Sequence, residues 1–144
     1  MKYRTACPND ASVCVDILRD WIAQTDWMPM LHSRASMIAF FAHRIAAIEG
    51  WVALRQDGKV VGFCLRDHDV VTALYIDAAV QRSGFGSGLL QLAMQDRTKL
   101  ELWILAQNEP AKAFYHKAGF CAVGGTQGDN EEGLPDIKMC WQAS

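Results

Sequence analysis

The sequence has almost no charge imbalance and no long apolar run. Its net charge of −2 at pH 7 provides no general attraction for nucleic acid or for an anionic membrane. No apolar segment approaches the roughly 20 residues that a bilayer-spanning helix needs, and the first residues contain no apolar signal core. We therefore expect a soluble, cytoplasmic protein that binds neither nucleic acid nor a membrane.

Clustered cysteines are also missing. The five cysteines are scattered and form no CxxC pair, and none of the four histidines flanks a cysteine pair. An odd cysteine count without a signal peptide argues against a disulfide framework, and the spacing argues against zinc. We expect buried, reduced thiols and no metal site.

What the sequence does have is enough apolar material for one core. Its 144 residues are 51% hydrophobic and 21% charged, and no repeat or low-complexity segment divides them. This composition suits a single domain spanning residues 1–144.

Periodicity and turn residues predict alternating helices and strands. Strands are expected at 2–7, 51–55, 59–65, 70–76, 100–105, 120–124 and 137–141. Helices are expected at 11–25, from a Ser33 cap to Gly50, after the glycine-rich stretch to about Arg97, and from Pro110 to Gly119. Residues 66–69 are expected to form a polar turn, and the tryptophans at 21, 51, 103 and 141 to be core. This order predicts an α/β fold with a mixed sheet covered by helices.

The main chemical signal is a glycine-rich run between a predicted strand and a predicted helix, Gln81-Arg82-Ser83-Gly84-Phe85-Gly86-Ser87-Gly88. Glycines let a ligand approach the backbone, and the N–H groups at the start of a helix are unpaired and partly positive. Such a site suits a pyrophosphate, with Arg82 adding a charged contact. The run lacks the lysine of a Walker loop, and its spacing after hairpin strands does not fit a dinucleotide-binding fold. The alternative is a flexible turn without a ligand.

A second block follows about twenty residues later in the chain. Residues 108–120, Asn-Glu-Pro-Ala-Lys-Ala-Phe-Tyr-His-Lys-Ala-Gly-Phe, resemble the Asn-x-x-Ala-x-x-Phe-Tyr-x-x-x-Gly-Phe block of GNAT acetyltransferases. The run from Gln81 to Gly86 resembles the Gln/Arg-x-x-Gly-x-Gly/Ala loop of the same superfamily. The strong resemblance covers residues 74–120. One departure is Ala78-Ala79, where many members carry a proline.

This resemblance implies a fold, a cofactor and a reaction. The GNAT fold has a mixed, mostly antiparallel sheet of about six to seven strands, flanked by about four helices and splayed between its fourth and fifth strands. Acetyl-CoA would lie in that gap, with its arm against Leu74, Tyr75 and Ile76 and a further contact at Asn108. Its pyrophosphate would lie on the run from Gln81 to Gly88. The implied reaction is N-acetyl transfer from acetyl-CoA to a primary amine by direct attack.

Tyr115 lies inside the second block, and the resemblance implies that it contacts the cofactor and acts as general acid. The attack of an amine on the thioester releases a CoA thiolate, which a phenol within hydrogen-bond reach can protonate. The alternative is a tyrosine that only packs.

The base that deprotonates the amine does not follow from the resemblance, because residues 70–76 carry no carboxylate. An amine of the lysine type has a pKa near ~10.4, so a base or a water chain assists the attack. Asp69 is the first choice. The other candidates are His68, Asp77, Glu131, Glu132 and Asp136, and for each the alternative is a solvated surface charge.

The acceptor site of the family is built from the first two helices, their connection and the late loop. At these places the chain carries Trp27, Met28, His32 and Glu132. The aromatic and thioether groups indicate an apolar wall, and the acidic loop 129–136 indicates a cationic acceptor, either a small molecule or a peptide. Edge strands near the C-terminus leave a homodimer open.

Two other functions stay open at this stage. A CoA-binding sensor or degenerate domain would bind acetyl-CoA without turnover, and a structural interaction domain would carry the glycine run by accident. The intact Tyr115 favours the enzyme, whereas the lack of an obvious base leaves the sensor as the main alternative.

Overall fold

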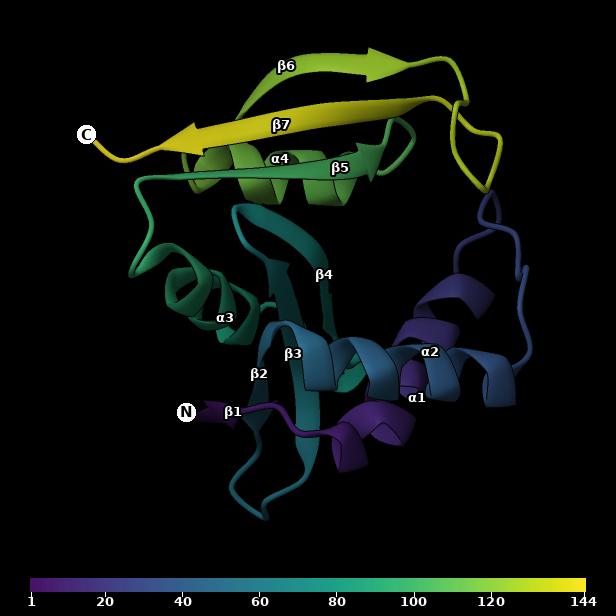
Figure 1. The fold of residues 1–144 in the computed structure, drawn as a ribbon, viewed down its shortest axis with the longest axis vertical. Helices are drawn as coiled ribbons and strands as arrows, with labels where there is room; N and C mark the ends of the chain where they lie inside the picture. Colours follow the sequence, from purple (N-terminus) through teal and green to yellow (C-terminus); the bar gives the residue numbers. More distant parts are fainter.

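Seven strands form one mixed sheet in the order β1-β2-β3-β4-β5-β7-β6 (Figure 1). The computed structural model describes all 144 residues. The strands are β1 (Lys2–Thr5), β2 (Glu49–Leu54), β3 (Val60–Asp67), β4 (Val70–Ile76), β5 (Lys99–Leu105), β6 (Cys121–Thr126) and β7 (Asp136–Gln142). The helices are α1 (Ala11–Ala23), α2 (Arg34–Ala47), α3 (Phe85–Met94) and α4 (Glu109–Lys117), with short 3-10 turns η1 (Pro8–Asp10) and η2 (Ala78–Val80). Only β4 and β5 pair in parallel, so the predicted mixed, mostly antiparallel fold is confirmed.

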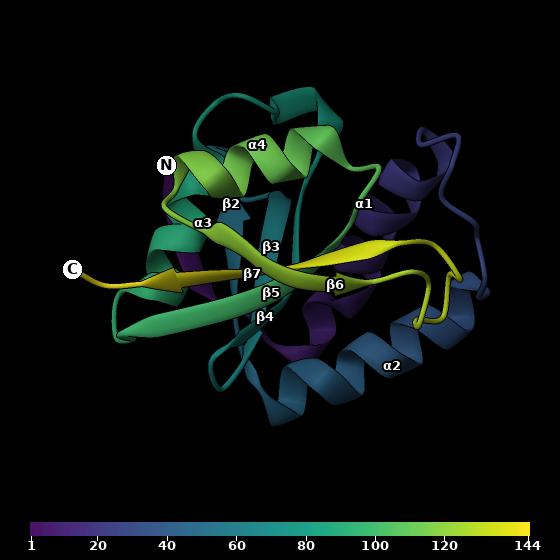
Figure 2. The ribbon, with the colours of Figure 1, turned by 90° about the horizontal axis from the view of Figure 1, so that it is seen from above.

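The helices cover both faces of the sheet. Figure 2 shows α2 and α4 on opposite sides of the strands, and two buried clusters follow this division. One cluster joins α1 and α2 to the sheet, and the other joins α3 and α4 to it. Because side chains alternate along a strand, β3 gives Phe63 to the first cluster and Cys64 to the second.

The sheet is splayed between β4 and β5, as the resemblance implied. These strands share only the pairs Val70 with Glu101 and Val71 with Leu102. Beyond this point β4 remains paired with β3 as far as Ile76, and β5 remains paired with β7 as far as Leu105. The gap therefore lies inside the sheet and has a backbone edge on each side.

Local sequence signals account for the ends of several elements. Ser33 caps α2, because its Oγ accepts a hydrogen bond from the Ser36 N–H at 3.1 Å. Asn108 caps α4 in the same way, with its Oδ1 accepting from the Ala111 N–H at 3.2 Å. Gly119 follows α4 with a φ of +103°, a left-handed conformation that favours glycine.

Three local predictions are wrong. Helix α2 ends before Gly50, which instead lies in β2, where a Cβ would approach a Leu65 methyl carbon to 2.6 Å. Arg66 and Asp67 continue β3, so that only the next two residues form the turn. The side chain of Trp103 is 48% exposed and is not core.

No helix combines the length and the hydrophobicity that a bilayer crossing demands. Of the five free thiols, Cys14 and Cys64 are buried as expected, and burial raises the pKa of each to about 12. Cys7 and Cys121 are exposed, so the expectation of buried thiols is wrong for these two.

Candidate active site

A cavity of about 520 Å³ opens where β4 and β5 diverge. Residues 71–75 of β4 and 102–105 of β5 form its two strand walls. The remaining lining residues come from α1 and the connection that follows it, from α4 and its N-cap, and from the segment around the β6–β7 loop: Trp21, Met28, Asn108, Ala111, Tyr115, Thr126, Asp129, Asn130, Glu132 and Asp136. A ligand in the gap would therefore contact both halves of the sheet.

Tyr115 is buried, yet it lines this cavity. Its ring packs edge-on against Phe114 and Phe120, at centroid distances of 5.1 Å and 5.5 Å. Among the side-chain nitrogen and oxygen atoms that are fully shielded from solvent, only Arg66 Nε lacks a hydrogen-bond partner. The Tyr115 hydroxyl also lacks a partner but is not among these shielded atoms, so it is open to the cavity. Burial, with smaller contributions from Cys64 and Tyr75, raises the pKa of Tyr115 above its ordinary value, so the phenol stays protonated at neutral pH.

Residues of β4 and α4 that were predicted to contact the cofactor arm mostly meet in the gap. Leu74, Tyr75 and Asn108 line the cavity. Ile76 does not line it, and its side chain instead packs toward Gly62 and Gly86. Asn108 also caps α4, so its presence has a structural reason as well.

The glycine-rich run forms an exposed turn that leads into α3. Gln81 to Gly84 are exposed, and both Arg82 and Gly84 have positive φ, at 66° and 92°. No side chain caps α3, which leaves the N–H groups of its first turn without a partner in the chain. Successive N–H groups in such a turn form a concave site for an anion.

Individual residues of this run contribute in different ways. A Cβ on Gly86 would lie 3.5 Å from the Phe114 ring, an ordinary van der Waals contact, so an alanine fits at this position. Gly88 is required by packing, because a Cβ there would approach Tyr3 Oη to 1.9 Å. Phe85 is buried against Tyr3 and could offer a ligand only its backbone. The hydroxyl of Ser83 donates to the Val80 carbonyl.

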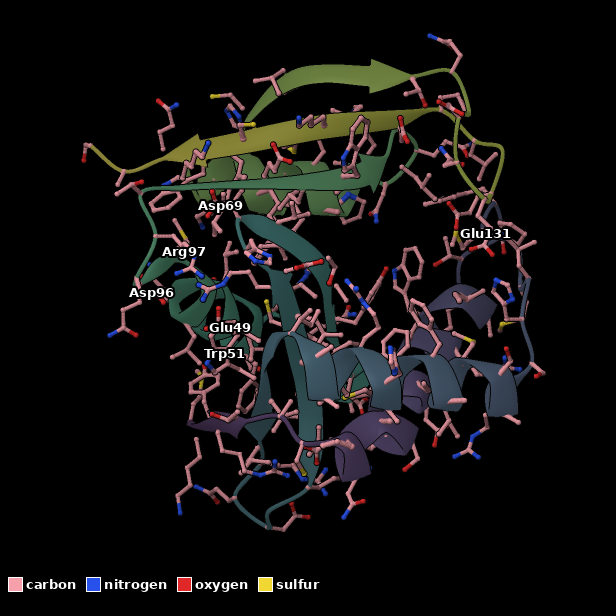
Figure 3. All side chains as sticks on the ribbon, viewed as in Figure 1. Glu49, Trp51, Asp69, Asp96, Arg97 and Glu131 are labelled. Carbon is pink, nitrogen blue, oxygen red and sulfur yellow. The ribbon has the colours of Figure 1, made fainter.

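The structure does not support Asp69 as the base. Asp69 lies at the closed end of β4, where its carbonyl accepts from the Glu101 N–H at 2.8 Å, and it lines neither main cavity. Its carboxylate lies 3.4 Å from Arg97 Nε. Figure 3 shows Asp69 beside Arg97, on the side of the molecule opposite to Glu131.

Asp69 belongs to a charged network around Arg66. The Arg66 side chain is fully buried and stacks over the Trp51 ring at 5.0 Å. Its guanidinium nitrogens lie 2.7 Å from carboxylate oxygens of Glu49 and of Asp96. Arg66 Nη1 also donates to the Ala93 carbonyl near the end of α3, at 2.6 Å. The network thus fixes α3 to β3, and it explains why Arg66 is directed inward instead of forming the predicted turn.

The acidic loop between β6 and β7 presents several carboxylates, and two of them are engaged. Asp136 accepts from the N–H and the Oγ1 of Thr126 at 2.8 Å and 2.7 Å and from Asn130 Nδ2 at 3.0 Å. Burial acts to raise the pKa of Asp136, but these hydrogen bonds hold it below the ordinary value. Glu131 pairs with His32 Nε2. Glu132 has no such partner and is half-buried.

Three of the four predicted acceptor residues, Met28, His32 and Glu132, line a second cavity of about 460 Å³. Trp27 lines neither cavity, and its ring packs edge-on against Trp21 at 5.9 Å. Sequence reasoning missed Trp21, Thr72 and Phe40 as cavity residues. Their helical or strand periodicity resembles that of core residues, so no local signal marked them.

A sheet that opens between its parallel strand pair, with an exposed glycine-rich turn before a helix, is the arrangement of the GNAT fold. The family model for the GNAT acetyltransferase domain matches residues 30–143. The peptidyl-lysine N-acetyltransferase YjaB of Escherichia coli K12 is 35% identical over 80 residues, which cover 56% of this chain and 54% of that protein. The aligned region is thus only about half the length of that relative.

Solved structures show the same fold over the whole chain. The apo form of YjaB from Escherichia coli superposes with a TM-score of 0.81 at 24% identity, covering 99% of this chain and 98% of that one. The acetyltransferase yncA from Salmonella typhimurium, solved with its cofactor acetyl-CoA, superposes with a TM-score of 0.73 at 19% identity, covering 99% and 94%. The chain belongs to the GNAT acetyltransferase family.

Proposed function

We propose that the protein transfers the acetyl group of acetyl-CoA to a primary amine by direct attack of the amine on the thioester. The observation that carries this proposal is the unpaired Tyr115 hydroxyl at the gap between two strands, where burial raises its pKa and favours the protonated form. The phosphate-binding turn lies close by, because Gly86 faces the ring of Phe114, the neighbour of Tyr115. A related fold solved with acetyl-CoA supports the choice of cofactor.

Different residues bind the pyrophosphate, align the pantetheine arm and protonate the leaving sulfur. The unpaired N–H groups at the start of α3 and the side chain of Arg82 hold the pyrophosphate. The open edge of β4, at Leu74 and Tyr75, aligns the pantetheine arm. Acetyl-CoA supplies an activated acyl thioester. As the C–N bond forms and the C–S bond breaks, Tyr115 donates its proton to the leaving sulfur, and solvent restores it.

The proton of the attacking amine needs a separate acceptor. With Asp69 at the closed end of β4, the residue of the acidic loop best placed for this task is Glu132, because it lines the cavity and has no partner within the chain. We propose that Glu132, directly or through water, receives this proton.

The experiment compares the wild type with Gly86→Glu and Gly86→Ala by calorimetry with acetyl-CoA and by thiol release with a panel of primary amines. Gly86→Glu should weaken acetyl-CoA binding at least about 100-fold, because its carboxylate would lie against the phosphates. Gly86→Ala is the matched control and should bind within a few-fold of wild type, since its Cβ fits at 3.5 Å.

Each outcome bears on the proposal. Binding together with amine-dependent thiol release supports it. Binding without turnover on any amine would show a CoA-binding sensor instead, for which the absence of a base on β4 is the favouring observation. No binding of acetyl-CoA would contradict both functions.

A further inference from the structure

The second cavity adjoins the first and extends away from the cofactor gap. The two share Met28, Thr72, Ala73, Tyr75 and Glu132. Tyr75 and Glu132 thus lie where the two cavities meet. Glu132 lies close enough to Tyr75 to reinforce the effect of burial, and the pKa of Tyr75 is raised to about 12.

The wall of the second cavity is mostly apolar. Its apolar side chains are those of Leu18, Ile22, Met28, Pro29, Met30, Leu31, Met37, Phe40, Phe41, Ala73 and Tyr75. Three of the large exposed apolar residues, Met30, Leu31 and Phe40, border this cavity, at 41%, 46% and 59% exposure. Exposed apolar groups gathered at a cavity mark a ligand site, and thioethers adapt to the shape of a ligand.

The charges of both cavities have one sign. No lysine or arginine lines either cavity, and the only histidine, His32, is paired with Glu131. Asp136 is satisfied within its loop, and Asp129 is exposed and lines only the first cavity. Glu132 is thus the half-buried, unpaired carboxylate at the junction.

We propose that the acceptor is a primary amine carried on an apolar body. The ammonium group lies beside Glu132 at the junction, and the apolar body occupies the second cavity against Met37 and Phe40. This inference rests on the proposed function and adds the chemical class of its acceptor. The acidic lining disfavours acceptors that carry phosphate, and the apolar wall disfavours polyamines whose second charge would lose its hydration.

A ladder of n-alkylamines measures the apolar contribution alone. Propylamine, pentylamine and heptylamine have the same reacting group and differ only in methylenes. With saturating acetyl-CoA, kcat/KM should rise about tenfold for each two methylenes that become buried. The diamine 1,5-diaminopentane should be a poorer substrate than pentylamine, because its second ammonium would enter the apolar cavity.

Two variants locate the effect. Phe40→Ser should lower the ratio of heptylamine to propylamine activity about tenfold, whereas Val123→Ser, an equally exposed apolar residue on β6, should leave it unchanged. Glu132→Gln should raise KM for every amine about tenfold and also lower kcat, because Glu132 receives the amine proton, without changing the affinity for acetyl-CoA. Its control is Asp20→Asn, an exposed carboxylate of α1 that lines neither cavity.

A second experiment, with peptides, distinguishes a small amine acceptor from a lysine in a peptide. Hexapeptides with one lysine flanked by leucine or by serine are compared under the same conditions. A gain with chain length among the alkylamines supports a small acceptor. A flat alkylamine series with a leucine preference that Phe40→Ser removes supports a lysine beside an apolar residue.

The inference is overturned if neither series shows an apolar gain, or if Phe40→Ser changes nothing. In that case acetyl-CoA binding and thiol release with other amines would persist, and the proposed function would stand. Loss of acetyl-CoA binding in the wild type would instead contradict the proposed function itself.

Discussion

Tyr115 is a phenol with no partner inside the chain, and at the scale of single residues it carries the sharpest prediction. Tyr115→Phe should lower kcat about 100-fold and leave acetyl-CoA affinity within about twofold, since only the hydroxyl is removed. Because the pKa of Tyr115 is raised, its ionisation should not reduce the wild-type rate below about pH 10. Thiol-release kinetics across pH and calorimetry measure both effects. A normal kcat in the variant would remove the acid role.

The residue scale also shows what a sequence can and cannot reveal. Tyr115 and the glycines belong to motifs whose spacing is local, so they could be found without coordinates. The position of Asp69 outside both cavities has a different origin. Its position beside β4 is evident from the sequence, but which end of β4 opens is set by pairing with β5, and that is a long-range contact.

At the scale of elements, the contact between β1 and the start of α1 depends on one buried carboxylate. Asp10 is 6% exposed and accepts two hydrogen bonds from Arg4, each 2.8 Å long, and one from the Cys7 N–H at 2.9 Å. Asp10→Asn should reduce the free energy of unfolding by about 1.5–3 kcal/mol at pH 7. The exposed pair Asp16–Arg34 provides the control, and Asp16→Asn should cost less than about 1 kcal/mol.

The pH dependence of this effect has a definite sign. The hydrogen bond from Arg4, opposed by burial, lowers the pKa of Asp10 in the folded state. The stabilisation is therefore complete above the unfolded pKa of about 3.9 and is lost as the pH falls through the folded pKa. Urea unfolding of wild type and Asp10→Asn at several pH values should show curves that converge in acid. A constant difference at all pH values would contradict the assignment.

Elements themselves were predictable where one pattern dominated. The apolar run from Val70 to Ile76 predicted β4 with the same bounds that the structure has. Ser33, as a cap residue, correctly predicted the start of α2. The prediction failed at Arg66, because a charged residue normally indicates a turn, whereas here two carboxylates and an indole ring compensate its burial. Such compensation comes from β2 and α3, which no local pattern connects to residue 66.

At the scale of the whole molecule, the gap leaves two rows of backbone groups without strand partners. Because the pantetheine arm would occupy this space, acetyl-CoA should slow amide hydrogen exchange in segments 72–76 and 103–105 more than in β2 or β6. Its binding should also stabilise the fold by about 2.7 kcal/mol at 100 times Kd. Exchange followed by mass spectrometry tests the first expectation and thermal unfolding the second. Protection spread evenly over the sheet would argue against this placement.

The acceptor side was predictable only in outline, and the reason lies in assembly at this same scale. Met28, Phe40 and Glu132 come from three segments that are distant in sequence, and they meet because α1, α2 and the β6–β7 loop converge at the open end of β4. A sequence pattern reports one element at a time. The second cavity is a property of several elements together.

The two residue pairs that join β4 to β5 fix the spacing of these strands at one end of the gap. One end of β4 is held by Arg97 and by the hydrogen bond from Glu101, while the other end is free of β5. Beyond Val71 no strand-to-strand pairing joins β4 to β5, so strand pairing does not fix the width of the gap there. We therefore expect tolerance for larger ligands to increase with distance from Val71, because strand pairing sets the spacing of β4 and β5 only at Val70 and Val71.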